Sequence, residues 1–386
     1  MTSRVLIATE LPLATRTVDL SAIARNVRRV LAIGGTPIMA VVKADAFGHG
    51  AVEVARATLA AGASWLGVAT VAEALELRRN GLDAPILAWL IDPWVDLEDA
   101  VRQRVTLSCA NAETLAAVTS AARVVDATAR VHLELDTGMA RGGSTVDDWG
   151  DLCERAAAAE TAGAVVADGV WSHLALASRA DERGVERSLA AFDHGVGVAL
   201  AAGLNPKHVH LANSAGALAH PSTRLSMVRV GAALYGIETV RGRSFGLEPA
   251  MRVVSHVAQL RRVEAGTGIG YLHEFVTSAP TTLALVPVGY ADGIPRALSR
   301  GGEVSIGGRR RPIRGAISMD QLVVEVNAND VRLGDEVVLL GDPRVGEPDS
   351  AEWARIADTV PHDVLCGFGE RVVRRHSELR PSGGVA

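Results

Sequence analysis

Between residues 37 and about 235, short apolar segments alternate with segments of helical periodicity, and this alternation constrains the fold more than any other feature. Continuous apolar strands separated by helices indicate a parallel sheet that is covered on both faces. Eight such strands in roughly 200 residues predict a (β/α)8 barrel. The predicted strands lie at residues 37–43, 65–70, 85–90, 105–109, 131–136, 168–173, 208–213 and 227–231. The helices predicted between and before them lie at 21–31, 51–62, 71–81, 112–122 and 151–163.

After residue 236 the pattern changes to strands and turns with few helices. Strand signals occur at 252–263, 281–293, 303–315, 321–326 and 335–341, and a short helix is predicted at 350–360. A chain of 386 residues also exceeds what one hydrophobic core usually serves. We therefore predict an α/β chain with two domains, an N-terminal (β/α)8 barrel at residues 1–245 and a mainly β C-terminal domain at 246–386. Roughly the first ten residues are expected to pair with the C-terminal domain.

Charge and composition exclude several classes of protein. The net charge is −5 and no basic block is present, which argues against a nucleic-acid partner. No apolar run is long enough to span a membrane, and Glu10 interrupts the N-terminal apolar stretch that a signal peptide would need. Cys109, Cys153 and Cys366 lack metal-type spacing and are odd in number. We expect a cytoplasmic protein with no metal site.

Polar residues stand at the ends of several predicted strands, where (β/α)8 barrels carry their chemistry. Each also has an ordinary interpretation: a strand-end lysine can extend along the surface, a lone histidine can be a satisfied core residue, and an Asn-Ser pair can cap the helix at 214–220. A site is favoured because the barrel would collect all of them on one face. These residues are Lys43, Asp136, Arg141, His173, Asn213, Ser214, Arg229 and Gly231.

The last two predicted strands suggest a phosphate site. Segments 213–216 and 227–236 offer a hydroxyl, backbone amides and glycines where many barrels bind phosphate. A lysine at the first strand facing such a site predicts pyridoxal 5'-phosphate, held covalently by Lys43 as an imine. Desolvation by the apolar residues 38–42 would give this lysine the lowered pKa that imine formation requires.

Seven motifs resemble those of bacterial alanine racemases. They are AVVKADAFGHG (40–50), DTGMAR (136–141), SHLALA (172–177), HLANSAG (210–216), MVRVGAALYG (227–236), VGYADG (288–293) and ISMDQ (317–321). The resemblance covers nearly the whole chain in the right order. It implies an amino-acid substrate and a homodimer whose active sites are shared between subunits.

The resemblance also implies roles for individual residues. Lys43 matches the cofactor lysine that acts as base on one face of the substrate, and Tyr271 matches the base on the opposite face, delivered by the partner subunit. Racemisation needs two bases because a proton leaves one side of a planar carbanion and another arrives from the far side. Tyr271 also has an ordinary interpretation, as an aromatic residue packing at an interface.

Other residues match cofactor and substrate contacts of the family. Arg229 matches the arginine that faces the ring nitrogen of the cofactor, and because arginine cannot accept a proton it would leave that nitrogen neutral. His173 lies near the ring and would link Arg229 to Tyr271. Asn213, Ser214, Gly231, Ala232 and His362 complete the cofactor-binding set, and Arg141, the Met319 amide, Tyr290 and Asp320 form the substrate set, with Asp320 alternatively a turn residue.

Three positions depart from the family pattern. Phe47 replaces a tyrosine whose hydroxyl helps to hold the phosphate, which predicts weaker cofactor retention. Glu134 stands where some members carry a carbamylated lysine, and it either supports Arg141 or is a solvated strand-end residue. His362 replaces a tyrosine of the inner gate, which would leave room for a longer or more polar side chain than methyl.

We therefore predict a pyridoxal-phosphate-dependent racemase that interconverts L- and D-alanine for peptidoglycan synthesis. A serine or broad-specificity racemase is the alternative that the gate position keeps open. A barrel-type amino-acid decarboxylase and a non-catalytic pyridoxal-phosphate carrier are more remote, because neither explains Tyr271 together with a second β domain.

Overall fold

The structure is a computed structural model that describes residues 12–92, 94–179, 182–327 and 329–377. The contacts among these residues divide the chain into two compact units. One unit runs from Leu20 to Glu248, and the other combines the described residues up to Asp19 with those from Pro249 onward.

The first unit contains a nearly closed barrel of eight parallel strands, which confirms the predicted fold class. The strand order is β8-β7-β6-β5-β4-β3-β2-β9, so the first barrel strand pairs with the last one. Each apolar segment that the sequence predicted overlaps one strand, and β6 and β7 begin two and three residues earlier than predicted. The strands are β2 (Ile38–Val41), β3 (Trp65–Thr70), β4 (Ile86–Leu90), β5 (Thr106–Cys109), β6 (Ala129–Glu134), β7 (Val165–Trp171), β8 (His208–His210) and β9 (Val228–Val230).

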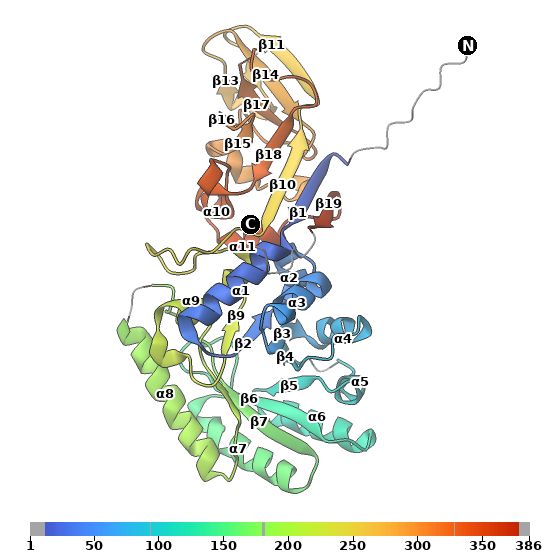
Figure 1. The fold of residues 1–386 in the computed structure, drawn as a ribbon, viewed down its shortest axis with the longest axis vertical. Coiled ribbons are helices and arrows are strands. Elements are labelled where there is room, and N and C mark those ends of the chain that lie inside the picture. Colours follow the sequence, from blue (N-terminus) through green and yellow to red (C-terminus); the bar gives the residue numbers. More distant parts are fainter. Residues whose placement is uncertain (1–11, 93, 180–181, 328, 378–386) are drawn as a thin grey trace, which may run out of the picture. The chain divides into compact units, whose positions relative to one another are not determined.

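Helices follow the strands and surround the sheet (Figure 1). One of them, α4, begins with a capping box in which Thr70 and Glu73 each satisfy a backbone N–H of the other. The helices are α1 (Leu20–Gly34), α2 (Lys43–Gly48), α3 (Ala51–Ala60), α4 (Val71–Arg79), α5 (Leu97–Arg102), α6 (Ala112–Val124), α7 (Val146–Thr161), α8 (Glu182–Ala201) and α9 (Ser214–Ala219), with 3-10 turns at Pro221–Thr223 and Ala232–Tyr235.

Large side chains fill the barrel interior. Met39, Trp65, Leu87 and Met227 form a buried cluster with Trp89 packed against it. The barrel is therefore a packed core, and chemistry is confined to the ends of its strands.

The second unit is mainly β, as predicted. A six-stranded sheet has the order β16-β15-β18-β10-β1-β19, a three-stranded sheet the order β11-β14-β17, and β12 pairs with β13. The elements are β1 (Ala14–Val18), β10 (Met251–His256), β11 (Gln259–Val263), β12 (Gly268–Ile269), β13 (Phe275–Val276), β14 (Thr281–Val286), β15 (Glu303–Ile306), β16 (Arg309–Pro312), β17 (Leu322–Val326), β18 (Glu336–Leu340), β19 (Val372–His376), α10 (Ser350–Ala357), α11 (Pro361–Cys366) and 3-10 turns at Tyr271–His273, Tyr290–Asp292, Arg296–Arg300 and Pro343–Val345.

The N-terminal strand β1 joins this second unit, pairing antiparallel with β10 and parallel with β19. The expectation that roughly the first ten residues pair there concerns residues 1–11, which lie outside the described part of the chain. Pairing is described from Ala14 onward.

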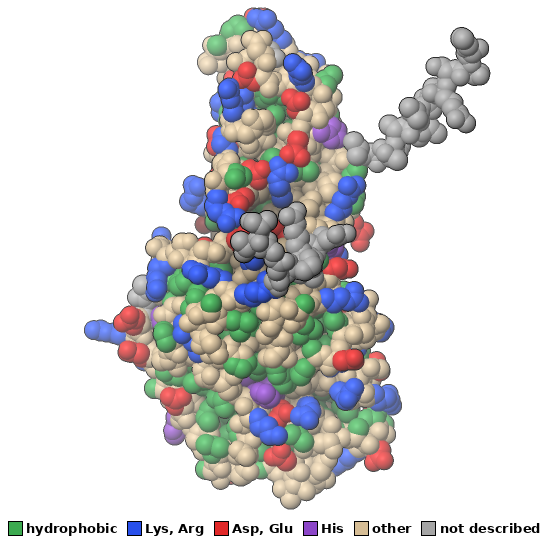
Figure 2. All heavy atoms as spheres, in the orientation of Figure 1, with side chains coloured by type: hydrophobic (Ala, Val, Ile, Leu, Met, Phe, Trp, Pro, Cys, Tyr) green, Lys and Arg blue, Asp and Glu red, His purple; other side chains and the backbone are tan. Residues whose placement is uncertain are grey.

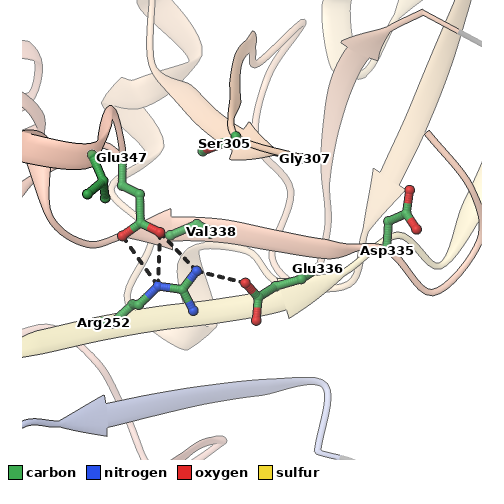
Figure 3. A pocket seen from close by; sticks show the side chains of 9 residues that line it. Arg252, Ser305, Gly307, Asp335, Glu336, Val338 and Glu347 are labelled. Atoms are coloured by element: carbon green, nitrogen blue, oxygen red, sulfur yellow. Dashed lines mark hydrogen bonds and ion pairs between the residues drawn. The ribbon is translucent and has the colours of Figure 1, made fainter. Parts of the chain in front are cut away.

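A pocket of about 340 Å³ opens in the second unit, and its polar lining is occupied by internal ion pairs (Figure 3). Arg252 reaches Glu347 at 2.9 Å and Glu336 at 2.7 Å. None of the residues that the sequence predicts for an active site lines it. On the face drawn in Figure 2, positive and negative side chains are interspersed. Among the helices of the described residues, none combines the length and the apolar composition needed to cross a membrane.

Candidate active site

Lys43 lies where the sequence predicts it, at the exit of the first barrel strand. Every residue of β2 is buried, while Lys43 is partly exposed at the start of α2. Its Nζ lies 5.6 Å from the centroid of the Trp89 ring. The barrel therefore presents an amine at the carboxyl end of its strands, bordered by an aromatic ring.

A left-handed turn follows Lys43 directly. Four successive residues, Ala44 to Phe47, have φ between 52° and 56°. Non-glycine residues in this conformation cost about 1–2 kcal/mol each. The turn is held from outside, because Glu73 accepts the Ala44 N–H at 2.7 Å, and from within, because the Nδ1 of His49 contacts the carbonyl oxygens of Ala46 and Phe47 at 2.9 Å each. The strain thus lies at the residues that position the lysine.

Phe47 packs beside the turn that follows β9. Its ring centroid lies 4.7 Å from that of Tyr235. A Cβ added to Gly231 would lie 3.2 Å from Phe47 Cζ and 3.3 Å from Val41 Cβ. A side chain at position 231 would crowd Phe47 and Val41, whereas glycine leaves this surface open.

Ser214 organises the donors of this turn. Its Oγ accepts N–H bonds from Gly231 at 3.2 Å and Ala233 at 3.3 Å, so its own hydroxyl hydrogen remains to be donated. The Ala232 N–H meets no acceptor among the described residues. Asn213 caps α9 by accepting the Gly216 N–H at 3.1 Å, as the ordinary interpretation of this pair expected. The turn can bind an oxyanion through Ser214 and Ala232.

Arg229 is a buried cation, 4% exposed. Its Nη1 donates to Nδ1 and to the carbonyl of His210, both at 3.0 Å, and its Nη2 donates to the Ser172 carbonyl at 2.7 Å. The guanidinium lies over the Trp171 ring, 4.7 Å from its centroid. Burial lowers the pKa of Arg229 to about 9, with Glu134 opposing the shift. Arg229 therefore remains charged at neutral pH.

His173 adjoins Arg229 on its other side. Two donors face its ring, because Arg229 Nη2 lies 3.3 Å from His173 Nδ1 and Asn213 Nδ2 lies 3.4 Å from His173 Nε2. Burial and the charge of Arg229 lower the pKa of His173 to about 3. The ring is neutral, so it can accept from only one of these two donors at a time.

Three residues that sequence reasoning missed continue this network into the barrel. His210 Nε2 lies 3.0 Å from His132 Nδ1, and His132 Nε2 lies 3.4 Å from Asp168 Oδ1. All three side chains are buried. The sequence signal is weak, because β6 and β8 contain further polar residues and only Asp168 is the single polar side chain of its strand.

Arg141 stands on a loop built around Asp136. The carboxylate of Asp136 accepts the N–H groups of Gly138, Met139 and Ala140 at 2.8–2.9 Å. Arg141 itself is exposed. The loop therefore has a fixed base and presents the guanidinium to solvent, where it can meet a carboxylate.

Glu134 closes β6 near both arginines. Burial raises the pKa of Glu134 to about 7, although the charges of Arg229 and Arg141 oppose the shift and that of Asp136 adds to it. Its carboxyl group thus changes charge in the neutral pH range.

The remaining predicted residues lie in the second unit. Tyr271 is 71% exposed on the loop between β12 and β13. Tyr290 and Met319 lie on two loops joined by backbone bonds, because the Tyr290 N–H donates to Ser318 at 3.1 Å. Asp320 pairs with Arg371 at 2.7 Å, which is a structural partner that sequence reasoning did not foresee. His362 lies exposed at the start of α11.

Two family models match most of the chain. Residues 18–239 match the family model "Alanine racemase, N-terminal domain" and residues 250–376 match "Alanine racemase, C-terminal domain". The alanine racemase of Salinispora arenicola is 44% identical over 365 residues, which cover 94% of this chain and 98% of that protein.

Solved structures give the same result. That of alanine racemase from D-cycloserine-producing Streptomyces lavendulae has a TM-score of 0.93 and 39% identity, covering 97% of this chain and 98% of that one. The structure of Bartonella henselae alanine racemase with covalently bound pyridoxal phosphate has a TM-score of 0.85 and 29% identity, and the match covers 95% of this chain and 100% of that one. The protein is thus a barrel with an appended β domain, of the two-domain racemase class. The chain belongs to the alanine racemase family.

The raised pKa of Glu134 predicts a pH dependence of stability. Because the group titrates at about 7 in the folded chain against 4.5 ordinarily, the wild type should lose free energy of unfolding relative to Glu134→Gln as pH rises from 4.5 through 7. Urea unfolding of both proteins at pH 5, 6, 7 and 8 measures the difference. The exposed Glu113→Gln is the control and should follow the wild type. Parallel stability curves for wild type and Glu134→Gln would contradict the assignment.

Proposed function

We propose that this protein is an alanine racemase that uses pyridoxal 5'-phosphate held on Lys43 and two bases on opposite faces of the substrate. The observation that carries the proposal is the collection, at the carboxyl ends of the barrel strands, of an amine, a buried guanidinium and a turn of hydroxyl and amide donors. Membership of the alanine racemase family supports it.

The residues fit the cofactor. Ser214 Oγ and the Ala232 N–H have hydrogens to give to a phosphate, and Gly231 leaves the cradle beside Phe47 that a Cβ would fill. Lys43 supplies the amine for covalent attachment. Arg229 supplies the cation that would face the ring nitrogen. Pyridoxal phosphate, when bound, provides the electron sink for negative charge at the α-carbon.

The side chains then divide the chemistry between them. Once the substrate amine has replaced Lys43 on the cofactor, the freed Lys43 Nζ can exchange a proton with the α-carbon on one face, and the Tyr271 hydroxyl can do so on the other. Arg141 and the Met319 N–H hold the substrate carboxylate. Arg229 offers only donors, so it leaves the ring nitrogen without a proton, which favours quick reprotonation of the α-carbon.

Assembly and location follow the same proposal. We place Tyr271, Tyr290 and Met319 in the active site of a partner subunit, so that a homodimer contains two shared sites. The enzyme works in the cytoplasm and supplies D-alanine for peptidoglycan.

Two substitutions separate the two bases. Lys43→Ala should abolish racemisation and covalent cofactor absorbance together. Tyr271→Phe should keep the absorbance but slow racemisation by about 10²–10⁴-fold, the usual contribution of a positioned acid or base. In deuterated water it should still exchange the α-hydrogen of one enantiomer of alanine, measured by proton NMR. Equal exchange of both enantiomers, or unchanged racemisation, would contradict the two-base assignment. Absence of any turnover by the wild type with cofactor bound would favour the carrier interpretation.

Phe47→Tyr should tighten cofactor binding. A hydroxyl at Cζ would lie beside the Gly231 turn and restore a hydrogen bond to a charged group, which lowers the dissociation constant of pyridoxal phosphate by about tenfold or more. Titration of the apoenzyme, followed by absorbance, measures it. Phe47→Leu is the control and should not tighten binding. An unchanged constant in Phe47→Tyr would mean that other donors already replace the hydroxyl.

Serine is the second candidate substrate, because histidine rather than tyrosine occupies position 362 at the exposed start of α11. We expect turnover of L-alanine to exceed that of L-serine, and His362→Tyr to lower the serine-to-alanine ratio of kcat/KM. Release of carbon dioxide from basic amino acids is assayed in parallel to test a decarboxylase. A ratio that His362→Tyr leaves unchanged removes the reason to invoke a widened gate.

A further inference from the structure

A chain of buried polar side chains runs from Arg229 through two histidines to an acid. Arg229 Nη1 donates to His210 Nδ1 at 3.0 Å, and His210 Nε2 lies 3.0 Å from His132 Nδ1. His132 Nε2 then lies 3.4 Å from Asp168 Oδ1, and neither of these two atoms has another partner among the described residues. The links come from β9, β8, β6 and β7, and the last three of these strands are neighbours in the sheet.

Both histidines are neutral, so each carries a single ring proton. Burial and neighbouring positive charge lower the pKa of His210 well below its usual value. Burial also lowers the pKa of His132, although Asp168 opposes the shift. Burial tends to raise the pKa of Asp168, but its contacts with His132 and Arg130 together outweigh that effect and lower the pKa below its usual value, so Asp168 is ionised.

The arginine end of the chain fixes one direction for the protons. Because a guanidinium only donates, Nδ1 of His210 accepts and the His210 proton sits on Nε2. That proton points to His132 Nδ1, so the His132 proton also sits on Nε2 and faces Asp168. Each link determines the next one.

The acid end requires the same direction. An ionised carboxylate only accepts, and Asp168 Oδ2 already accepts from Arg130 Nη1 at 2.5 Å. The other oxygen, Oδ1, can therefore only accept a hydrogen bond, which His132 Nε2–H donates. Both ends of the chain specify the same tautomer of both rings.

Packing prevents the rings from rotating to another arrangement. A Cβ on Gly169 would lie 2.3 Å from the His132 ring, so that ring fills the space of the missing side chain. The His210 ring stacks on Trp171 at an interplanar angle of 5°. With both rings fixed, the direction can change only if both histidines change tautomer.

We propose that Asp168 is a positioning residue for Arg229, acting through the tautomers of His132 and His210. When residue 168 offers no acceptor, both histidines can adopt the opposite tautomer. His210 Nδ1 then carries a hydrogen that faces the N–H of Arg229, and the guanidinium loses its hydrogen bond to this nitrogen. The inference deepens the proposed function, on which it rests for what Arg229 faces.

Nitrogen NMR of ¹⁵N-histidine-labelled wild type measures the tautomers without any activity assay. Signals of His132 and His210, assigned with His132→Gln and His210→Gln, should both show a protonated Nε2 and an unprotonated Nδ1 at pH 7.5. A proton on Nδ1 of either ring, or on both nitrogens, would overturn the proposal whether or not the protein racemises alanine.

Variants of the acid then test the positioning role in the holoenzyme. Asp168→Ala should populate the second tautomer of His210 and lower kcat for alanine by about tenfold, the scale of one hydrogen bond to a charged group. KM should change less than about twofold, because the substrate carboxylate is held elsewhere. Asp168→Asn keeps one acceptor oxygen, which should face the buried His132 while the exposed Arg130 turns to solvent, so this variant should retain the wild-type tautomers and most of kcat.

Glu160→Gln is the matched control. Glu160 accepts, at 3.3 Å, the N–H of Ala167, the residue that precedes Asp168 on β7, and this contact involves no histidine. This variant should leave tautomers and kcat unchanged. Unaltered tautomers and kcat in Asp168→Ala would reject the positioning role. Loss of racemisation in every protein, including the wild type, would reject the proposed function instead, while the NMR result still decides the direction of the chain.

Discussion

The burial of one cation determines much of the barrel interior. A guanidinium taken out of water is costly unless its donors are paired. Arg229 therefore draws acceptors from neighbouring strands, including His210, the Ser172 carbonyl and the face of Trp171. These acceptors in turn require partners, which extends the polar path to Asp168. A requirement at one end of the barrel thus sets residue types in the middle of strands that would otherwise be apolar.

The strands of the barrel could be predicted from sequence because burial on both faces leaves a direct record as continuous apolar runs. The helix α8 was missed although it spans 20 residues. Glycines within α8 weaken the helical signal. Gly195 is needed nevertheless, because a Cβ at this position would lie 2.2 Å from the Leu135 side chain. The Gly195 carbonyl also accepts a hydrogen bond from Trp149 Nε1. Tertiary packing overrides propensity at this position, and no local pattern announces it.

The candidate site likewise contains residues that the sequence predicts and residues that it does not. Residues at strand ends, such as Lys43 and Ser214, were predictable because topology alone brings strand ends together. His132 and Asp168 were not singled out, because their importance comes from contacts between strands far apart in sequence. In the left-handed turn Ala44–Phe47, Asp45 is the single residue of a type that tolerates this conformation, which is too weak a signal to predict the turn.

That turn also bears on the order of folding. Its strain is offset by Glu73, 29 residues further along the chain, and the same carboxylate accepts the N–H groups of Ala69 and Thr70. The turn therefore gains its support only once β3 and the first turn of α4 have formed beside β2. Local elements form before such distant contacts because loop closure has to be met first. The lysine consequently takes its position in an already assembled part of the barrel rather than in a nascent chain.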